Sequence, residues 1–250
     1  MMQIGLQTFT VRKLLHSPKV IDQVFSHLAK LGLNNLELAV DYLKFPFTVE
    51  QARWIRSLAD KHGLRVRSCQ IKYATAAADI PATIAYMREL GANILVNSTI
   101  DLNRMNSRDG LLRYCEMLDE LNYRLGDITL AHHNHHYEFL RMEEGNVLSF
   151  MAANSTVDFA LDTYWCQRGG GNVLVLLEEL RGRVPVMHLR DFTITKRGLI
   201  TGGTDCEIGR GNIPFPAVLR AAQAAGVRYG MIEQKTKTLL ESVRISLQNL

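Results

Sequence analysis

Histidine and carboxylate side chains gather at the ends of predicted strands in the second half of the chain. Four of the eight histidines fall within residues 132–136, and Asp162, His188 and Glu233 each stand near the end of a later apolar run. A mixed set of nitrogen and oxygen donors suits one divalent ion of Mn, Co, Zn, Fe or Mg rather than a thiolate-loving metal. The spacing therefore predicts a metal site built from one residue of each of four strands.

Strand alternation narrows the choice of side chains, because residues two apart in a strand point the same way. His133 and His135 share a face with the small Ala131, and Asp162 shares a face with Ala160. We expect these faces to point inward. One histidine or carboxylate from each of four adjacent strands would then converge at the barrel mouth.

Each position also has an ordinary structural explanation when it is taken alone. An aspartate at a strand end, such as Asp162, commonly caps a helix, and a single histidine such as His188 commonly makes a structural hydrogen bond. A single Glu233 would commonly pair with arginine or lysine. Their occurrence in order, at the ends of successive strands, favours the metal site.

Eight short apolar runs must position these groups. Each is followed by a longer segment of helical period, which is the pattern of repeated βα units. The predicted strands are Ile4–Phe9, Asn35–Ala39, Val66–Ile71, Ile94–Asn97, Ile128–His133, Val157–Asp162, Val186–Leu189 and Tyr229–Glu233. The predicted helices lie near 18–32, 49–63, 80–91, 105–126, 145–154, 172–182, 215–226 and 237–249.

Eight alternations without a Gly-rich nucleotide-binding fingerprint favour a closed α/β barrel, the (β/α)8 TIM barrel, over an open doubly wound sheet. Four of the helices stop at a glycine before the next strand, which suggests one unit used repeatedly. These glycines are Gly32, Gly63, Gly91 and Gly226. No linker-like segment divides the chain, so we expect a single barrel domain over residues 1–250, with its reactive groups at the C-terminal ends of the strands.

Composition limits the classes of partner. The chain has 250 residues, 47% of them hydrophobic, and a formal net charge of +4 with no basic stripe. We expect no nucleic acid partner, whereas a small anionic substrate would be compatible with this charge. The sequence carries no signal for an oligomeric interface and leaves a homo-oligomer open.

The cysteines and the N-terminal residues indicate the compartment. Cys69, Cys115, Cys166 and Cys206 form no CxxC pair, and the first residues lack the features of a signal peptide. No apolar run approaches the ~18 residues of a transmembrane helix. We therefore expect free thiols, a cytoplasmic location and no membrane association.

At these residues the sequence resembles the xylose isomerase-like TIM barrel superfamily, specifically its sugar phosphate isomerase/epimerase group. The resemblance covers almost the whole chain and includes the opening residues 4–12 and Glu37. Residues 133–139, HNHHYEF, resemble the group's HNHxxEF signature, and residues 207–213 resemble its GxG loop. The strand ends at residues 161–165, 187–191 and 232–234 also resemble family strand ends.

The resemblance implies a metal held by Glu, Asp, His and Glu from successive late strands. Asp162, His188 and Glu233 match three of these places. The first place departs from the pattern, because many relatives have a glutamate where this chain has His133. The fourth ligand is then His133, or Glu138 reaching back from the loop, or absent.

The resemblance implies a metal-dependent isomerase or epimerase acting on a keto-sugar or sugar phosphate through an enediolate. A carboxylate, Glu138 or Glu233, or else His135, would move the proton, and Arg190 would steady the substrate oxygens. For the substrate itself we expect contacts from three further side chains, Gln70, Tyr164 and Trp165. Lys196, Arg197 and Arg210 are candidates for a phosphate contact, although such loop residues are commonly only solvated.

Three other functions remain open. A lyase or dehydratase acting on a keto-sugar or keto-cyclitol would abstract the same proton but expel water or an aglycone. A DNA-repair endonuclease is disfavoured by Gln70 and by the small net charge. A barrel without metal could serve as a sugar-binding partner subunit, because fold does not fix function.

Overall fold

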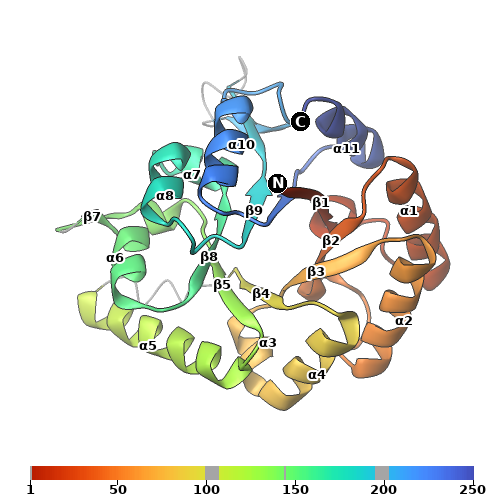
Figure 1. Ribbon diagram of the computed structural model, residues 1–250, viewed down its shortest axis with the longest axis horizontal. Helices are drawn as coiled ribbons and strands as arrows, with labels where there is room; N and C mark the ends of the chain where they lie inside the picture. The colour runs from red at the N-terminus through yellow and green to blue at the C-terminus, as the bar shows by residue number, and fades with distance from the viewer. Residues whose placement is uncertain (1, 99–106, 144, 195–202) are drawn as a thin grey trace.

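Eight parallel strands close into a barrel, and helices surround it (Figure 1). The computed structural model describes residues 2–98, 107–143, 145–194 and 203–250. The barrel strands are β1 (Gln3–Gln7), β2 (Asn35–Ala39), β3 (Arg65–Gln70), β4 (Ile94–Asn97), β5 (Thr129–His133), β8 (Asp158–Asp162), β9 (Val186–Leu189) and β12 (Tyr229–Ile232). Every neighbouring pair is parallel, and β1 pairs with both β2 and β12, which closes the ring. The predicted closed α/β barrel is confirmed.

The helices cover the outside of the barrel and lie close to the predicted ranges. They are α1 (Pro18–Lys30), α2 (Val49–Lys61), α3 (Tyr73–Ala78), α4 (Ile80–Leu90), α5 (Arg108–Leu125), α6 (Val147–Asn154), α7 (Thr163–Arg168), α8 (Val173–Glu179), α10 (Phe215–Ala224) and α11 (Leu239–Gln248). Residues 105–106 of the fourth predicted helix lie outside the described residues. Two short helices, α3 and α7, were not predicted, because six residues are too few to show a helical period.

The first strand is shorter than predicted. It ends at Gln7, and a 3-10 helix, η1 (Thr8–Val11), follows where the prediction had extended the strand to Phe9. The Gln7 side chain accepts a hydrogen bond from the Phe9 backbone N–H, which turns the chain away from the sheet. A side-chain cap of this kind competes with the strand ladder, so the strand stops two residues early.

Two antiparallel hairpins leave the barrel near the predicted site. One pairs β6 (Arg141–Met142) with β7 (Gly145–Asn146), and the other pairs β10 (Asp191–Thr193) with β11 (Thr204–Cys206). In Figure 1 the β6–β7 hairpin projects from the rim of the barrel. The β10–β11 hairpin begins two residues after β9, so it continues directly from a strand of the barrel wall.

The four glycines predicted to end helices all adopt left-handed backbone angles. Gly32, Gly63, Gly91 and Gly226 have φ values of 88°, 70°, 74° and 86°. Gly91 is itself the C-cap of α4, and its N–H bonds to the carbonyl oxygen of Arg88. Residues with a Cβ are rarely stable at positive φ, so glycine ends each helix and lets the chain return to the sheet.

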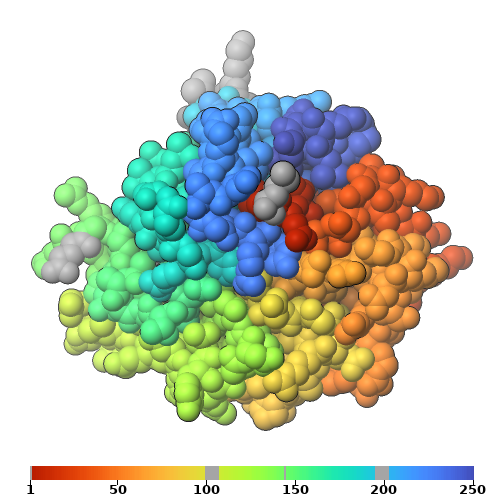
Figure 2. Space-filling view, in the orientation of Figure 1, coloured from red at the N-terminus to blue at the C-terminus, as the bar shows by residue number. Residues whose placement is uncertain are grey.

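The core has two layers on opposite sides of the barrel wall. The larger layer fills the space between the strands and the helices. In Figure 2 the segments follow one another around the viewed face in chain order, from red to blue. The smaller layer lies inside the barrel and consists of Ile94, Val96, Ala131, Ala160, Val186 and Met231. Four of these residues stand two positions before His133, Asp162, His188 and Glu233. The barrel is therefore apolar in its middle and polar immediately above, toward the C-terminal ends of the strands.

Within the part of the chain that the structure describes, no helix combines the length and the apolar character needed to cross a membrane.

Candidate metal centre

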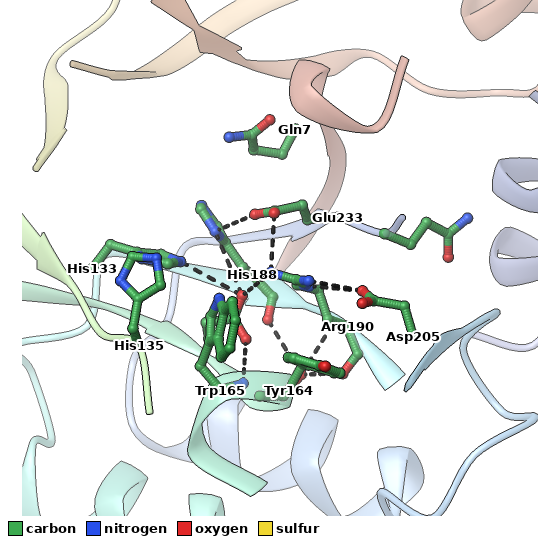
Figure 3. Close-up of polar contacts among 12 residues, drawn as sticks. Gln7, His133, His135, Tyr164, Trp165, His188, Arg190, Asp205 and Glu233 are labelled. Atoms are coloured by element: carbon green, nitrogen blue, oxygen red, sulfur yellow. Dashed lines mark hydrogen bonds and ion pairs between the residues drawn. The ribbon is translucent and has the colours of Figure 1, made fainter. Parts of the chain in front are cut away.

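Four side chains from neighbouring strands converge at the C-terminal end of the barrel (Figure 3). His133 and Asp162 are the last residues of β5 and β8, His188 lies in β9, and Glu233 follows β12 directly. One ligand atom of each residue lies within 4.8 Å of the others, and all four residues are buried. These are the four residues for which the sequence predicted a metal site. The fourth place in the cluster is occupied by His133 rather than by Glu138.

Asp162 divides its two carboxylate oxygens between the fold and the cluster. Its Oδ1 accepts the backbone N–H of Trp165 at 2.8 Å and so caps helix α7. Its Oδ2 lies 3.5 Å from Nε2 of His133 and 4.0 Å from Nδ1 of His188. Oδ1 thus fills the structural role expected of a lone aspartate, and Oδ2 is left facing the cluster as a candidate ligand atom.

His188 is fixed by a carboxylate on the far side of its ring. Its Nε2 lies 2.6 Å from Oε1 of Glu37, a buried residue of β2 that also accepts the Ser68 hydroxyl hydrogen. Its Nδ1 faces the cluster, 2.8 Å from Oε2 of Glu233, but has no partner in good hydrogen-bond geometry among the described residues. Burial alone would lower the pKa of His188, but Glu37 and Glu233 raise it to about 10. An imidazole held by a carboxylate through one nitrogen presents the other to a metal.

The imidazole of His133 is neutral and has no hydrogen-bond partner among the described residues. Neither ring nitrogen is bonded to any residue that the structure describes. Burial, and then the charge of His188, hold its pKa well below the ordinary value. A buried polar atom without a partner is costly and commonly indicates a missing ion or water. The lone pair of His133 and the open Nδ1 of His188 therefore fit a divalent metal between them.

Glu233 also divides its oxygens. Its Oε2 is the atom near His188, and its Oε1 lies 3.1 Å from Nη1 of Arg190. Burial would raise the pKa of Glu233, but Arg190 and His188 together lower it strongly. Burial raises the pKa of Asp162, which Arg190 partly offsets. The cluster thus contains a carboxylate held in its ionised form by a fixed cation.

Glu138 supports the loop after β5. Its Oε1 lies 3.0 Å from Nε2 of His132, and its Oε2 accepts the backbone N–H of His135 at 2.8 Å. Both oxygens are therefore bonded within the chain, and the residue is fully buried. His132 and His133 are adjacent in β5 and point to opposite sides of the barrel wall, so the Glu138–His132 pair lies behind the cluster.

Aromatic rings line one side of the site. The ring of His135 stacks on Tyr137 at 5.0 Å and lies 5.1 Å from Trp165, while exposed His136 stacks on the indole at 5.3 Å. Burial lowers the pKa of His135 to about 3, so this imidazole is neutral. Its Nδ1 lies 3.0 Å from the Tyr137 hydroxyl. Trp165 is half-buried, so part of its ring remains open to a bound molecule.

The other predicted substrate contacts lie on two sides of the site. Half-buried Gln70 ends β3, and its side-chain oxygen accepts a hydrogen bond from the amide of Gln7. Tyr164 is buried, and its hydroxyl accepts a hydrogen bond from Arg168 at 2.9 Å. The Tyr164 ring lies 4.6 Å from the guanidinium carbon of Arg190. Tyr164 therefore supports Arg190, whereas Gln70 is accessible at the mouth.

Of the predicted phosphate contacts, Lys196 and Arg197 lie outside the described residues. Arg210 is exposed and lies 3.5 Å from Glu207. Its loop is organised by buried Asp191, which accepts the backbone N–H groups of Gly209 and Gly211 at 2.9 Å each. A Cβ on Gly211 would lie 2.2 Å from Oδ1 of Asp191, which is why the loop requires glycine there.

Three polar residues of the site were not assigned a role from the sequence. Gln7 at the end of β1 lies above Glu233 in Figure 3, and Asp205 in β11 bonds Arg190. Glu37 was noted only as part of the family resemblance. A charged residue inside the apolar strand β2 is a usable signal for Glu37, but nothing in the local pattern distinguishes Asp205 from an ordinary hairpin residue.

A search among curated protein sequences found no match. Among solved structures, a sugar phosphate isomerase/epimerase from Parabacteroides distasonis ATCC 8503 superposes with a TM-score of 0.77 at 21% identity, covering 99% of this chain and 92% of that one. The 3-keto-D-glucoside 4-epimerase from E. coli gives a TM-score of 0.70 at 15% identity, with coverages of 99% and 98%.

A probable 3-DHS dehydratase from Bacillus anthracis gives a TM-score of 0.69 at 9% identity, again with coverages of 99% and 98%. At these identities the three structures show the shared fold. The sequence pattern of the xylose isomerase-like TIM barrel family matches residues 25–244, which is most of the chain. This protein belongs to the xylose isomerase-like TIM barrel family.

Proposed function

We propose that this protein is a metal-dependent isomerase or epimerase that acts on a small keto-sugar or sugar phosphate. The observation that carries the proposal is the buried cluster of His133, Asp162, His188 and Glu233 at the C-terminal mouth of the barrel. In barrels of this type the reactive groups stand at that end of the strands. Similarity to the isomerase/epimerase and epimerase structures supports the same reaction class.

The four clustered residues would hold one divalent ion. Two imidazole nitrogens and two carboxylate oxygens suit Mn, Fe, Co or Zn, and also accept Mg less favourably. When bound, such an ion supplies Lewis-acid polarisation of a substrate carbonyl, which makes the neighbouring C–H proton easier to remove.

Proton transfer falls to Glu233 and His135. Glu233 is ionised and its carboxylate points into the cluster, so it is placed to accept a proton there. His135 is neutral and contacts the Tyr137 hydroxyl through Nδ1, which leaves Nε2 to give or accept a proton. Glu138 bonds His132 and the His135 backbone behind the cluster, so we assign it to holding the His135 loop in place.

The substrate would lie between the aromatic wall and the amides of the early strands. The half-buried ring of Trp165 offers an apolar face to the C–H groups of a sugar, and Gln70 offers an amide to its hydroxyl groups. These contacts fix orientation, while the reacting atoms face the metal cluster.

A lyase or dehydratase on the same kind of substrate is the second candidate. One observation favours it: His133 stands where the family resemblance places a glutamate, so the cluster has one carboxylate fewer. An epimerase that works on both faces of a carbon needs two proton-transfer groups of similar strength, whereas elimination needs one base and one acid. Ionised Glu233 and neutral His135 are not two groups of similar strength, which suits elimination better than epimerisation.

Metal content and proton exchange together test the proposal. Wild-type protein purified without chelator should hold about one ion per chain, and Asp162→Asn, His188→Ala and Glu233→Gln should each lose it. His133→Ala tests the fourth ligand, and Arg183→Met serves as a control because Arg183 bonds only backbone carbonyl groups outside the site. Wild type that binds no divalent metal after add-back would contradict the proposal and favour a sugar-binding subunit.

Keto-sugars incubated with the enzyme in D2O then separate the two reactions by NMR. An epimerase should place deuterium at the carbon next to the carbonyl and return an isomer of equal mass apart from the label. A dehydratase should release water and give an unsaturated ketone. The absence of both products across keto-sugars and their phosphates would contradict the catalytic assignment.

A further inference from the structure

A buried arginine lies against the ligand cluster and contacts two of the four ligands. Nη1 of Arg190 lies 3.1 Å from Oε1 of Glu233 and 3.4 Å from Oδ2 of Asp162. The side chain is 2% exposed, which makes it the largest fully buried side chain among the described residues. Arg190 is therefore a fixed cation in contact with two of the residues that would bind the metal.

Asp205 of β11 holds the opposite side of the guanidinium. Its Oδ1 accepts hydrogen bonds from Nη2 of Arg190 at 2.8 Å and from Nε at 3.1 Å. The rings of Tyr164 and Trp165 lie 4.6 and 5.3 Å from the guanidinium carbon and fix the plane of the group. With three carboxylates and two rings around it, the guanidinium has little room to turn toward a substrate.

Arg190 partly neutralises the negative charge of the carboxylates around it. Asp162 and Glu233 are two buried carboxylates within 4.8 Å of one another through their ligand atoms, and Asp205 adds a third nearby. Buried like charges repel strongly unless a counter-charge lies between them. In the metal-free protein Arg190 supplies such a counter-charge together with His188, which lies 2.8 Å from Glu233, and Arg190 also repels an incoming divalent cation.

We propose that Arg190 is a built-in counter-cation of the metal centre, with Asp205 as the residue that positions it. Arg190 stabilises the ligand carboxylates before metal binds and thereby limits the affinity for the metal, while Asp205 draws its charge away from the ligands. The inference rests on the proposed metal site and adds a role for the Arg190–Asp205 pair that is separate from substrate binding.

The two residues should change metal affinity in opposite directions. Removing the cation in Arg190→Met should strengthen Mn²⁺ binding by about tenfold or more, because a unit charge beside a divalent ion is poorly screened in the interior. Removing the anion in Asp205→Asn should weaken binding by about tenfold, because Arg190 then acts fully on Asp162 and Glu233. Arg190→Lys keeps the charge and should stay near wild type.

The measurements are Mn²⁺ titrations by calorimetry and thermal unfolding with and without Mn²⁺. Arg190→Met should lower the unfolding temperature of the chelated protein and gain more from Mn²⁺ than wild type does. Arg183→Met is the matched control: it should lower the unfolding temperature equally in both conditions and leave the Mn²⁺ affinity unchanged.

Each outcome has a definite meaning. If wild type fails to bind Mn²⁺, the proposed function and this inference fail together. If wild type binds Mn²⁺ but Arg190→Met and Asp205→Asn both weaken binding, the pair is only structural and the inference alone is overturned. Opposite changes, with the double variant near wild type, would establish the counter-cation.

Discussion

The two halves of the barrel mouth carry different chemistry. Strands β5, β8, β9 and β12 end in the histidine and carboxylate cluster, whereas β1 and β3 end in the neutral amides Gln7 and Gln70. In the first half, both carboxylate oxygens of Glu37 are hydrogen-bonded, one to His188 and the other to Ser68. One half is therefore suited to a metal ion and the other to hydroxyl groups, and the proposed function would separate metal binding from substrate recognition in the same way.

The largest expected effect comes from the charged half. Glu233→Gln and Asp162→Asn should remove the bound metal and lower kcat by about a thousandfold or more, because each loses a ligand and Glu233 is also the proposed base. Metal analysis and steady-state kinetics on the substrate found by screening measure the two effects. Full metal occupancy in either variant would break the assignment of that half.

A smaller effect is expected where the early half supports the late half. Glu37→Gln should weaken metal binding by about 10- to 100-fold, because His188 loses the carboxylate that orients it. Glu207→Gln is the matched control, since Glu207 bonds Ser242 and Arg210 away from the cluster. Equal affinities of the Glu37 and Glu207 variants would show that His188 needs no such support.

The pH dependence of metal affinity tests the protonation state of His188. Its pKa of about 10 without metal means that the imidazole is protonated at pH 7 and must lose a proton to bind metal. Metal affinity should therefore rise by about tenfold per pH unit between pH 7 and 9, with about one proton released per ion at pH 7. Calorimetry in buffers of different ionisation enthalpy counts that proton.

The same shift predicts how the chelated protein responds to pH. A folded pKa raised above 6.5 adds stability that is fully present below about pH 6.5 and is lost as the pH rises through about 10. The chelated wild type should thus lose stability toward alkaline pH more steeply than chelated His188→Ala. If the stability of the two proteins changed equally with pH, His188 would not be the group with the raised pKa.

The smallest effect is expected in the neutral half. Gln70→Ala should raise KM by about two- to tenfold, because the substrate would lose one or two hydrogen bonds. The metal content should stay unchanged. The size of the KM change for different sugars would show which hydroxyl group the amide contacts. Loss of metal in this variant would contradict the separation between the two halves.

Much of the fold was predictable because its signals are local. Alternating apolar runs and helical periods gave eight strands within a few residues of their observed bounds, and the glycines after helices marked the returns to the sheet. The first strand was predicted two residues too long, since the cap made by the Gln7 side chain leaves no trace in hydrophobicity. Helices α3 and α7 were missed because they are short.

The convergence of the four clustered side chains was also predictable, for a related reason. Strand parity placed His133, Asp162, His188 and Glu233 two residues beyond Ala131, Ala160, Val186 and Met231, which fill the barrel interior. The choice between His133 and Glu138 could not be made from the pattern. It depends on His132 turning Glu138 to the outer side of the wall, a contact between neighbouring elements.

The sequence by itself determined the order of strands and helices, the inward face of each strand and the residue types at the strand ends, because these depend on spacing along the chain. Only the tertiary structure decided which of these residues support one another. Glu37 meets His188 across 151 residues, and Arg190 meets Glu233 across 43. These contacts exist because the barrel closes and brings distant strands together, and closure is a property of the whole chain rather than of any segment.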